Sequence, residues 1–198
     1  MEQMGYGQVR TNAVAPGMNR LLTEAGFTIA QELMLFSLPH WTPPRLDRKA
    51  LPGCTLKRPV RLGTGLWPAL RREILELDAS CFGESWALDD GLLDDALRAT
   101  TRSTVWIARH DRCLTGFVIA GVAGDMGYVQ RLAVHSEHRQ QGLATALVER
   151  AVHWAARRGA RHSLVNTEVT NLPARALYEK MGFSPLPTRL TVLHKELR

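Results

Sequence analysis

Cysteine is scarce in this chain, with only three among 198 residues. Cys54, Cys81 and Cys113 lie far apart, and no pair of them has the CxxC spacing of a thiolate metal site. This usage is typical of free thiols in a reducing compartment. We therefore expect neither a disulfide framework nor a zinc site, and we assign no metal ligands.

Long apolar runs are also lacking. No uninterrupted apolar stretch approaches the roughly 20 residues that a membrane-spanning helix needs, and no charged-then-apolar signal peptide opens the sequence. We expect a soluble, cytoplasmic protein with no membrane partner. Hydrophobic residues make up 45% and charged residues 22%, which is the mixture of a globular protein with a buried core.

Negative charge is in deficit, and the formal net charge is +6. Such a surplus favours acidic partners, namely nucleic acid, an anionic membrane or a phosphorylated cofactor. The densest basic run, from Arg45 to Lys49, is short and contains an aspartate. It argues against nucleic acid as the partner.

A proline-rich stretch divides the chain. Residues 37–59 contain five prolines, and five lysines or arginines lie among them. Proline favours extended backbone in itself and in the residue before it, so this composition predicts a linker. We expect a strand–helix–strand unit at residues 1–38, a linker at residues 39–53 and the main domain at residues 54–198.

Beyond the linker, apolar residues spaced by three or four positions predict helices, and short β-branched runs predict strands. The predicted helices span residues 67–82, 88–97, 142–158 and 173–181. The predicted strands span residues 103–108, 116–122, 128–134, 163–169 and 190–195. Strands joined first in a hairpin and then alternating with helices predict an α/β (α+β) fold, with a mixed central sheet flanked by helices.

The N-terminal unit resembles a later part of the same chain. Residues 9–27 can be laid on residues 165–183 without gaps, so that both copies end in Gly-Phe. The first copy has Leu22 where the second has Tyr178, and no phosphate-binding segment precedes it. We interpret it as a structural half-unit, with chance similarity as the alternative. A repeat that begins in mid-fold suggests further residues upstream of Met1.

The segment from Leu132 to Ala144 carries the clearest chemical signal. A strand runs into a basic turn, and the turn opens the most regular helix of the chain. A helix N-terminus offers unpaired N–H groups and the positive end of the dipole, which together suit a pyrophosphate. Gly142 would let the backbone approach the phosphates. Positive charge could come from three nearby side chains, Arg131, His138 and Arg139.

Two motifs then give a resemblance to a known family. The turn matches Q/R-x-x-G-x-G/A at Arg139-Gln140-Gln141-Gly142-Leu143-Ala144. Downstream, the segment from Asn171 to Phe183 matches Asn…Ala…Leu-Tyr-x-x-x-Gly-Phe. In both motifs the chain resembles the GNAT superfamily of N-acetyltransferases, over roughly residues 54–197. It most resembles the branch that acetylates protein N-termini, including ribosomal-protein alanine acetyltransferases.

The resemblance implies acetyl-CoA as the cofactor and a role for each matched residue. The turn would hold the coenzyme A pyrophosphate through Arg139, Gln140, Gln141, Gly142, Leu143 and Ala144. The strand end would pair with the pantetheine arm and polarise the thioester, through Leu132, Ala133 and Val134. Asn171 would bind the pantetheine arm or order the next helix, with Ala174 on the same cofactor surface. Tyr178 would protonate the departing thiolate as general acid.

Each role in the second motif has a structural alternative. Which group acts as general base is also left open. Tyr178 could be a packing residue and Asn171 a plain N-cap. Where some N-terminal acetyltransferases carry a catalytic glutamate, this chain has Asn166. Glu168 lies two residues further on, which places it on the same strand face, and it is our catalytic candidate. Glu84 or a chain of water molecules are the alternatives.

The expected reaction is direct attack of an amine on the acetyl thioester in a ternary complex. The acceptor would be a peptide N-terminus or a small primary amine, and a homodimer is left open. Two other functions are also left open. One is a non-catalytic sensor that binds acyl-CoA, and the other is a basic nucleic-acid-binding module whose affinity would fall steeply with salt.

Overall fold

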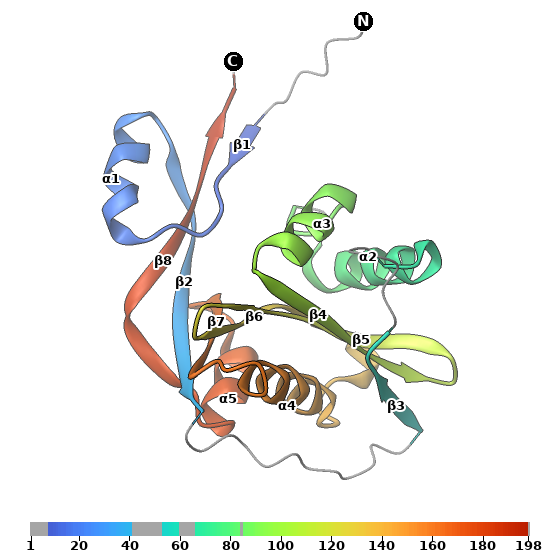
Figure 1. The fold of residues 1–198 in the computed structure, drawn as a ribbon. Helices are drawn as coiled ribbons and strands as arrows, with labels where there is room; N and C mark the ends of the chain where they lie inside the picture. The colour runs from blue at the N-terminus through green and yellow to red at the C-terminus, as the bar shows by residue number, and fades with distance from the viewer. Residues whose placement is uncertain (1–7, 41–52, 60–65, 84, 198) are drawn as a thin grey trace, which may run out of the picture. The chain divides into compact units, whose positions relative to one another are not determined.

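The computed structural model describes residues 8–40, 53–59, 66–83 and 85–197 (Figure 1). These residues fall into two units, which are described separately. The larger unit runs from Leu38 to Leu164, and the smaller one combines the chain up to Ser37 with the chain from Val165 onward. Most of the predicted linker lies outside the described residues.

The larger unit is built on antiparallel strands in the order β6-β5-β4-β3. Their bounds are β3 (Cys54–Lys57), β4 (Arg102–His110), β5 (Cys113–Ala123) and β6 (Met126–Val134). Asp111 and Arg112, with φ of 46° and 70°, form the two-residue turn between β4 and β5. Two consecutive left-handed residues are the geometry of a type I′ hairpin. The predicted hairpin is therefore confirmed.

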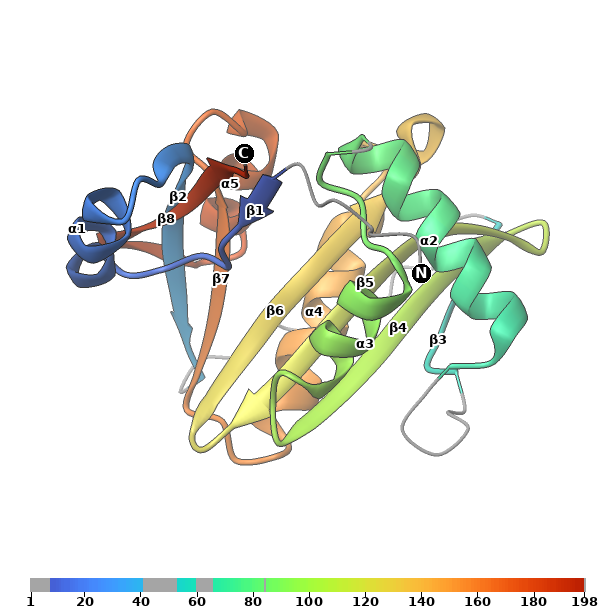
Figure 2. The same ribbon diagram turned by 90° about the horizontal axis from the view of Figure 1, so that it is seen from above.

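Helices cover both faces of this sheet (Figure 2). On one face lie α2 (Pro68–Phe82) and α3 (Asp90–Arg98), whose apolar stripes form a buried cluster with Phe117 and Ile119 of β5. On the other face lies α4 (Leu143–Ala156). Gly116 permits its close approach, since a Cβ there would lie 3.1 Å from Leu147 Cδ1. The predicted helices at residues 67–82, 88–97 and 142–158 are confirmed, apart from one or two residues at their ends.

Strand β3 was not predicted. It has only four residues, between Pro52 and Pro59, and it pairs with β4 at the outer end of the strand order. Proline is compatible with the ends of an edge strand because such positions need not donate to a neighbour. Two of the prolines that indicated a linker therefore lie on either side of a strand.

The smaller unit contains two strand–helix–strand runs. The first consists of β1 (Gln8–Arg10), α1 (Pro16–Glu24) and β2 (Thr28–Pro39). The second consists of β7 (His162–Glu168), α5 (Leu172–Lys180) and β8 (Ser184–Glu196), with the start of β7 belonging to the larger unit. Strands β2 and β8 run antiparallel, side by side (Figure 1). The first residue of each strand lies opposite the end of the other, Thr28 by His194 and Ser184 by Ser37. The two runs thus meet about a local two-fold axis.

All three cysteines are free thiols. Across the described ranges, no helix is both long enough and apolar enough to cross a membrane.

One carboxylate of α2 lies in the core of the larger unit. Asp78 is fully buried and accepts hydrogen bonds from Arg131 Nε and Nη2, each at 2.7 Å, and from the backbone N–H of Leu88 at 2.7 Å. Arg131 Nη2 also donates to the carbonyl oxygen of Trp86 at 2.7 Å. The guanidinium lies 3.5 Å from the centre of the Phe82 ring. This pair fastens β6 to α2 and to the segment that follows it.

We expect Asp78→Ala to lower the free energy of unfolding by about 3–5 kcal/mol, because Arg131 then keeps a largely buried charge without its carboxylate. Urea unfolding followed by circular dichroism measures this loss. Asp90→Ala is the matched control: Asp90 also pairs with an arginine, Arg71, but its side chain is 75% exposed. Asp90→Ala should lower the free energy of unfolding by less than about 1 kcal/mol. Equal losses in the two variants would contradict the prediction.

Candidate functional site

At the end of β6, the backbone N–H and C=O groups of two residues point away from the neighbouring strand β5. The backbone N–H of His135 donates to the carbonyl oxygen of Thr115 at 2.9 Å. Backbone groups alternate along an antiparallel strand, so those of Ala133 point toward β5 and those of Leu132 and Val134 point away from it. Leu132 and Val134 therefore do not use their backbone groups to pair with β5.

Between β6 and α4 the chain makes a tight turn. After a short 3-10 helix at Ser136–His138, Gln140 and Gly142 adopt left-handed conformations, with φ of 61° and 83°. Helix α4 begins at Leu143 with Gly142 as its N-cap, and no side chain caps it. Its first N–H groups therefore lack a side-chain acceptor, and the positive end of the helix dipole lies at the turn. This geometry fits a pyrophosphate.

Side chains of the turn hold its shape. Arg139 Nε donates to the carbonyl oxygen of Val134 at 3.1 Å, and Gln141 Nε2 donates to that of Glu137 at 3.1 Å. Val134 also accepts a hydrogen bond from Cys81 Sγ at 3.4 Å. The ring of His138 is centred 5.2 Å from that of His110. Arg139 and Gln141 thus brace the backbone of the turn with their side chains, whereas Gly142 provides its left-handed bend.

One prediction about this turn was wrong. Arg131 was expected to add positive charge for the phosphates, but its guanidinium is bound to Asp78 in the core. The sequence carried a signal for this pairing. Asp78 lies on the same helical stripe as Ile74 and Leu77, which are buried, and a carboxylate on a core-facing stripe requires a buried partner.

The second motif lies in the smaller unit, on α5. The side chain of Asn171 accepts a hydrogen bond from the backbone N–H of Ala174 at 3.2 Å and so caps the helix. The N-cap role considered from the sequence is therefore present. The N–H of Ala174 is already paired with this cap.

Tyr178 lies in the interior of the smaller unit, with 4% of its surface exposed. Its ring contacts the rings of Phe36 and Phe183, with centres 6.0 Å and 5.7 Å away. Burial raises the pKa of the Tyr178 hydroxyl to about 12. The phenol therefore keeps its proton at neutral pH, which is the form that a general acid needs.

Glu168 ends β7. Alternate residues of this strand are buried, and Asn166 and Glu168 both lie on its more open face. The shared face expected for these two residues is confirmed. Thr170 Oγ1 donates to Glu168 Oε2 at 3.4 Å. Glu84, the weaker candidate for the base, lies outside the described residues.

With these features in place, comparison with known proteins identifies the class. Residues 71–183, more than half of the chain, match the model of the Acetyltransferase (GNAT) family. The chain therefore belongs to the GNAT family of acetyl-CoA-dependent acetyltransferases. The predicted family and the predicted fold class are both confirmed.

Similar proteins include enzymes named for amino-terminal acetylation. N-alpha-acetyltransferase 30 of Schizosaccharomyces pombe is 40% identical over 57 residues, which cover 29% of this chain and 38% of that protein. A protein of Bacillus subtilis described as a candidate ribosomal protein bS18-alanine N-acetyltransferase is 27% identical over 112 residues, covering 57% of this chain and 73% of that protein. The chain thus aligns with well under half of the yeast relative.

Among solved structures, the GCN5-related N-acetyltransferase of Sphaerobacter thermophilus superposes with a TM-score of 0.63. It is 18% identical, and the match covers 96% of this chain and 60% of that one. At this identity the likeness concerns the fold alone.

The raised pKa of Tyr178 predicts a specific loss of stability at high pH. The folded pKa of about 12 exceeds the ordinary value of 10.0, so the associated stability is intact below pH 10 and is lost as pH rises toward 12. At pH 11 this loss is about 1.4 kcal/mol. Urea unfolding at pH 9 and pH 11 should show it in the parent but not in Tyr178→Phe. An identical pH dependence in both proteins would contradict the prediction.

Proposed function

We propose that the protein is an N-acetyltransferase that transfers the acetyl group of acetyl-CoA to a primary amine by direct attack. The observation that carries the proposal is the N-terminus of α4, which begins without a side-chain cap after left-handed Gln140 and Gly142. It is a ready anion site at the position of the family's first motif.

Acetyl-CoA would supply the activated acyl group as a thioester. In the larger unit, the N–H groups from Gln140 to Ala144 would bind its pyrophosphate, and the backbone of Leu132 and Val134 would hold the pantetheine arm. An N–H group of this strand end would also stabilise negative charge on the thioester oxygen during attack.

In the smaller unit, Tyr178 would donate the proton that the departing sulfur needs. Its ring is held between Phe36 and Phe183, and its raised pKa keeps it protonated. Asn171 would act by ordering α5, because its side-chain oxygen already accepts the N–H of Ala174. Ala174 would contribute to the cofactor surface through its side chain, because its N–H is paired.

The acceptor we propose is the α-amino group of a peptide. The two relatives named for N-alpha and alanine acetylation support this class, and small amines are the alternative. An α-amino group has a pKa near 8, so an appreciable fraction is neutral at physiological pH and a modest base is enough. Glu168, on the open face of β7, is the candidate for that base.

A non-catalytic acyl-CoA sensor is the second candidate. Asn166 favours it, since an amide stands where some N-terminal acetyltransferases have a glutamate and an amide cannot accept the proton. A sensor would share the phosphate-binding turn but would not depend on the Tyr178 hydroxyl.

Calorimetric titration tests the cofactor site. We expect micromolar binding of acetyl-CoA to the parent and at least about 100-fold weaker binding to Gly142→Glu, a change of about 2.7 kcal/mol. The new carboxylate would repel the phosphates and occupy their space. Gly159→Glu is the matched control, because Gly159 has a φ of 87° and open space around it beyond the other end of α4. It should bind acetyl-CoA as the parent does, and equal weakening in both variants would point to backbone strain instead.

Tyr178→Phe tests whether the Tyr178 hydroxyl acts as the general acid. We expect kcat for acetylation of an amino-terminal peptide to fall by about 100-fold or more, because the departing thiolate loses its proton donor. The affinity for acetyl-CoA should stay within a factor of two of the parent. Release of free coenzyme A thiol measures turnover, and titration measures affinity. Undiminished turnover would remove Tyr178 from the mechanism. No turnover by a parent that binds acetyl-CoA tightly, over a panel of peptides and small amines, would favour the sensor.

A further inference from the structure

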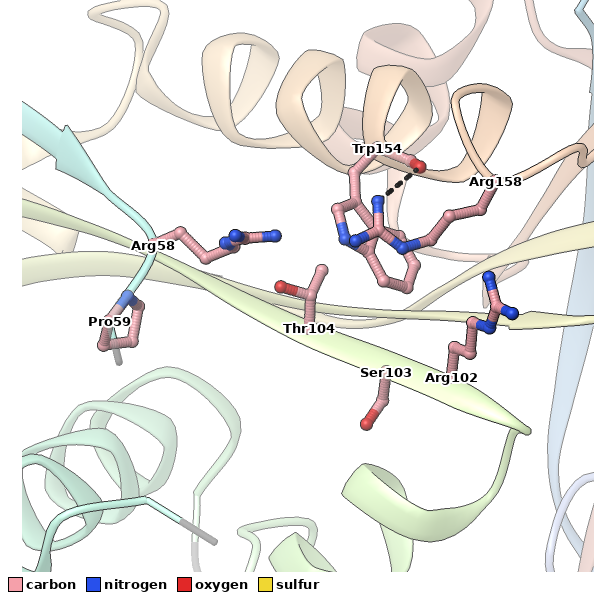
Figure 3. A pocket seen from close by; sticks show the side chains of 7 residues that line it. All are labelled: Arg58, Pro59, Arg102, Ser103, Thr104, Trp154 and Arg158. Atoms are coloured by element: carbon pink, nitrogen blue, oxygen red, sulfur yellow. Dashed lines mark hydrogen bonds between the residues drawn. The ribbon is translucent and has the colours of Figure 1, made fainter. Parts of the chain in front are cut away.

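A second basic cavity lies in the larger unit, beyond the end of α4 that is opposite the phosphate-binding turn (Figure 3). Its volume is about 530 Å³, and Arg58, Arg102, Thr104, Trp154 and Arg158 are among the residues that line it. Helix α4 has 14 residues, which at 1.5 Å per residue separate its two ends by about 20 Å. The cavity is therefore distinct from the proposed acetyl-CoA site.

Three arginines reach this cavity from separate segments. Arg58 follows β3, Arg102 opens β4, and Arg158 follows α4. Within the described part of the chain, none of the three forms an ion pair with a carboxylate. Elsewhere in this unit arginines do find carboxylates, as Arg71, Arg98, Arg109 and Arg131 show. The cavity thus gathers three arginines that no carboxylate of the described residues pairs with.

The positive charges of the arginines around this cavity repel one another. Burial, and then the positive charges of Arg58, Arg102 and Arg157, lower the pKa of the Arg158 guanidinium. A bound anion would relieve this repulsion, because each guanidinium would gain an opposite charge within hydrogen-bond reach. All three arginines line the same cavity, so a single ligand there could contact each of them.

Trp154 forms part of the cavity wall. The residue is 5% exposed, and its indole Nε1 is covered by protein atoms, with no hydrogen-bond partner among the described residues. A buried donor left unpaired costs about 1–3 kcal/mol, so a small shift of the ring that brought Nε1 to an anion oxygen in the cavity would be favoured. In Figure 3, Arg58 and Arg158 extend toward the indole from different sides, and Thr104 points into the same space.

We propose that this cavity binds a small molecule carrying adjacent phosphate groups. Three guanidiniums carry more positive charge than one phosphate neutralises, whereas linked phosphates carry more negative charge and offer more oxygens to their planar forks. Arg158 lies over the indole ring of Trp154, 4.4 Å from its centre. That ring face is therefore covered, so the cavity recognises the phosphates of its ligand and does not stack a nucleobase. The three arginines converge on one hollow, which suits a small anion better than a nucleic-acid strand.

Titration with inorganic tripolyphosphate, at a fixed ionic strength of about 0.15 M, tests the proposal. Arg102→Glu is the diagnostic variant: Arg102 is exposed, so charge reversal should leave the fold intact. We expect its affinity for tripolyphosphate to fall at least about 10-fold, since one attraction becomes a repulsion. Arg72→Glu is the matched control, with the same charge change at another exposed arginine whose nearest carboxylate, on Glu76, is 4.0 Å away. It should bind tripolyphosphate like the parent. Arg58→Glu repeats the test from a different segment, in case Arg102→Glu alters the start of β4.

Other outcomes would overturn the proposal. Absence of binding to the folded parent would exclude the site, and equal weakening by Arg72→Glu would indicate diffuse charge attraction. Orthophosphate binding as tightly as tripolyphosphate would reject the requirement for adjacent phosphates. A short single-stranded RNA that binds more tightly than tripolyphosphate and loses affinity in Arg102→Glu would assign the cavity to nucleic acid. Acetyl-CoA keeps the two sites separate: Arg102→Glu should retain acetyl-CoA binding, and tripolyphosphate should still bind the cavity of the parent when saturating acetyl-CoA occupies the turn at the start of α4.

Discussion

The buried pair of Asp78 and Arg131 is the interaction on which the proposed cofactor strand depends. Arg131 directly precedes Leu132, so the pair fixes the part of β6 whose backbone we propose to face a pantetheine arm. Cys81, three residues after Asp78 on α2, contacts the carbonyl oxygen of Val134, three residues after Arg131. Helix α2 therefore holds the end of β6 at two points. The proposed anion site in the turn needs this fixed starting point, because N–H groups stabilise an anion well only when their directions are preset.

A comparable dependence links the N-terminal run to the proposed acid. Phe36 of β2 is fully buried and packs against Tyr178 of α5. Burial is the cause of the raised pKa of this phenol, so the first copy of the repeat would contribute to the proposed chemistry without supplying a reacting group. We interpret the N-terminal run in this way: it is structural in composition, since Leu22 replaces tyrosine, and it completes the surroundings of the tyrosine in the second copy.

The sequence predicted what depends on neighbouring residues. The stripe of α4, the glycine before it and the cap of α5 are local patterns, and the structure contains each of them. Features that depend on contacts between residues far apart in the sequence were missed or were predicted wrongly. Arg131 was assigned to the turn because it is close in sequence, although its partner Asp78 lies on another element. Strand β3 was hidden by its prolines, and the pKa of Tyr178 depends on Phe36, which no local pattern connects to it.

The smaller unit is discontinuous in the chain, since residues up to Ser37 and from Val165 onward form it together. During synthesis, the segment from Leu38 to Leu164 can begin to fold while the first strand–helix–strand run still lacks its pairing partner β8. That run must wait until β8, which ends at Glu196, has also left the ribosome. A chain terminated before β8 would carry the turn at the start of α4 without a buried Tyr178. The proposed acetyl transfer would therefore require a chain synthesised through to β8.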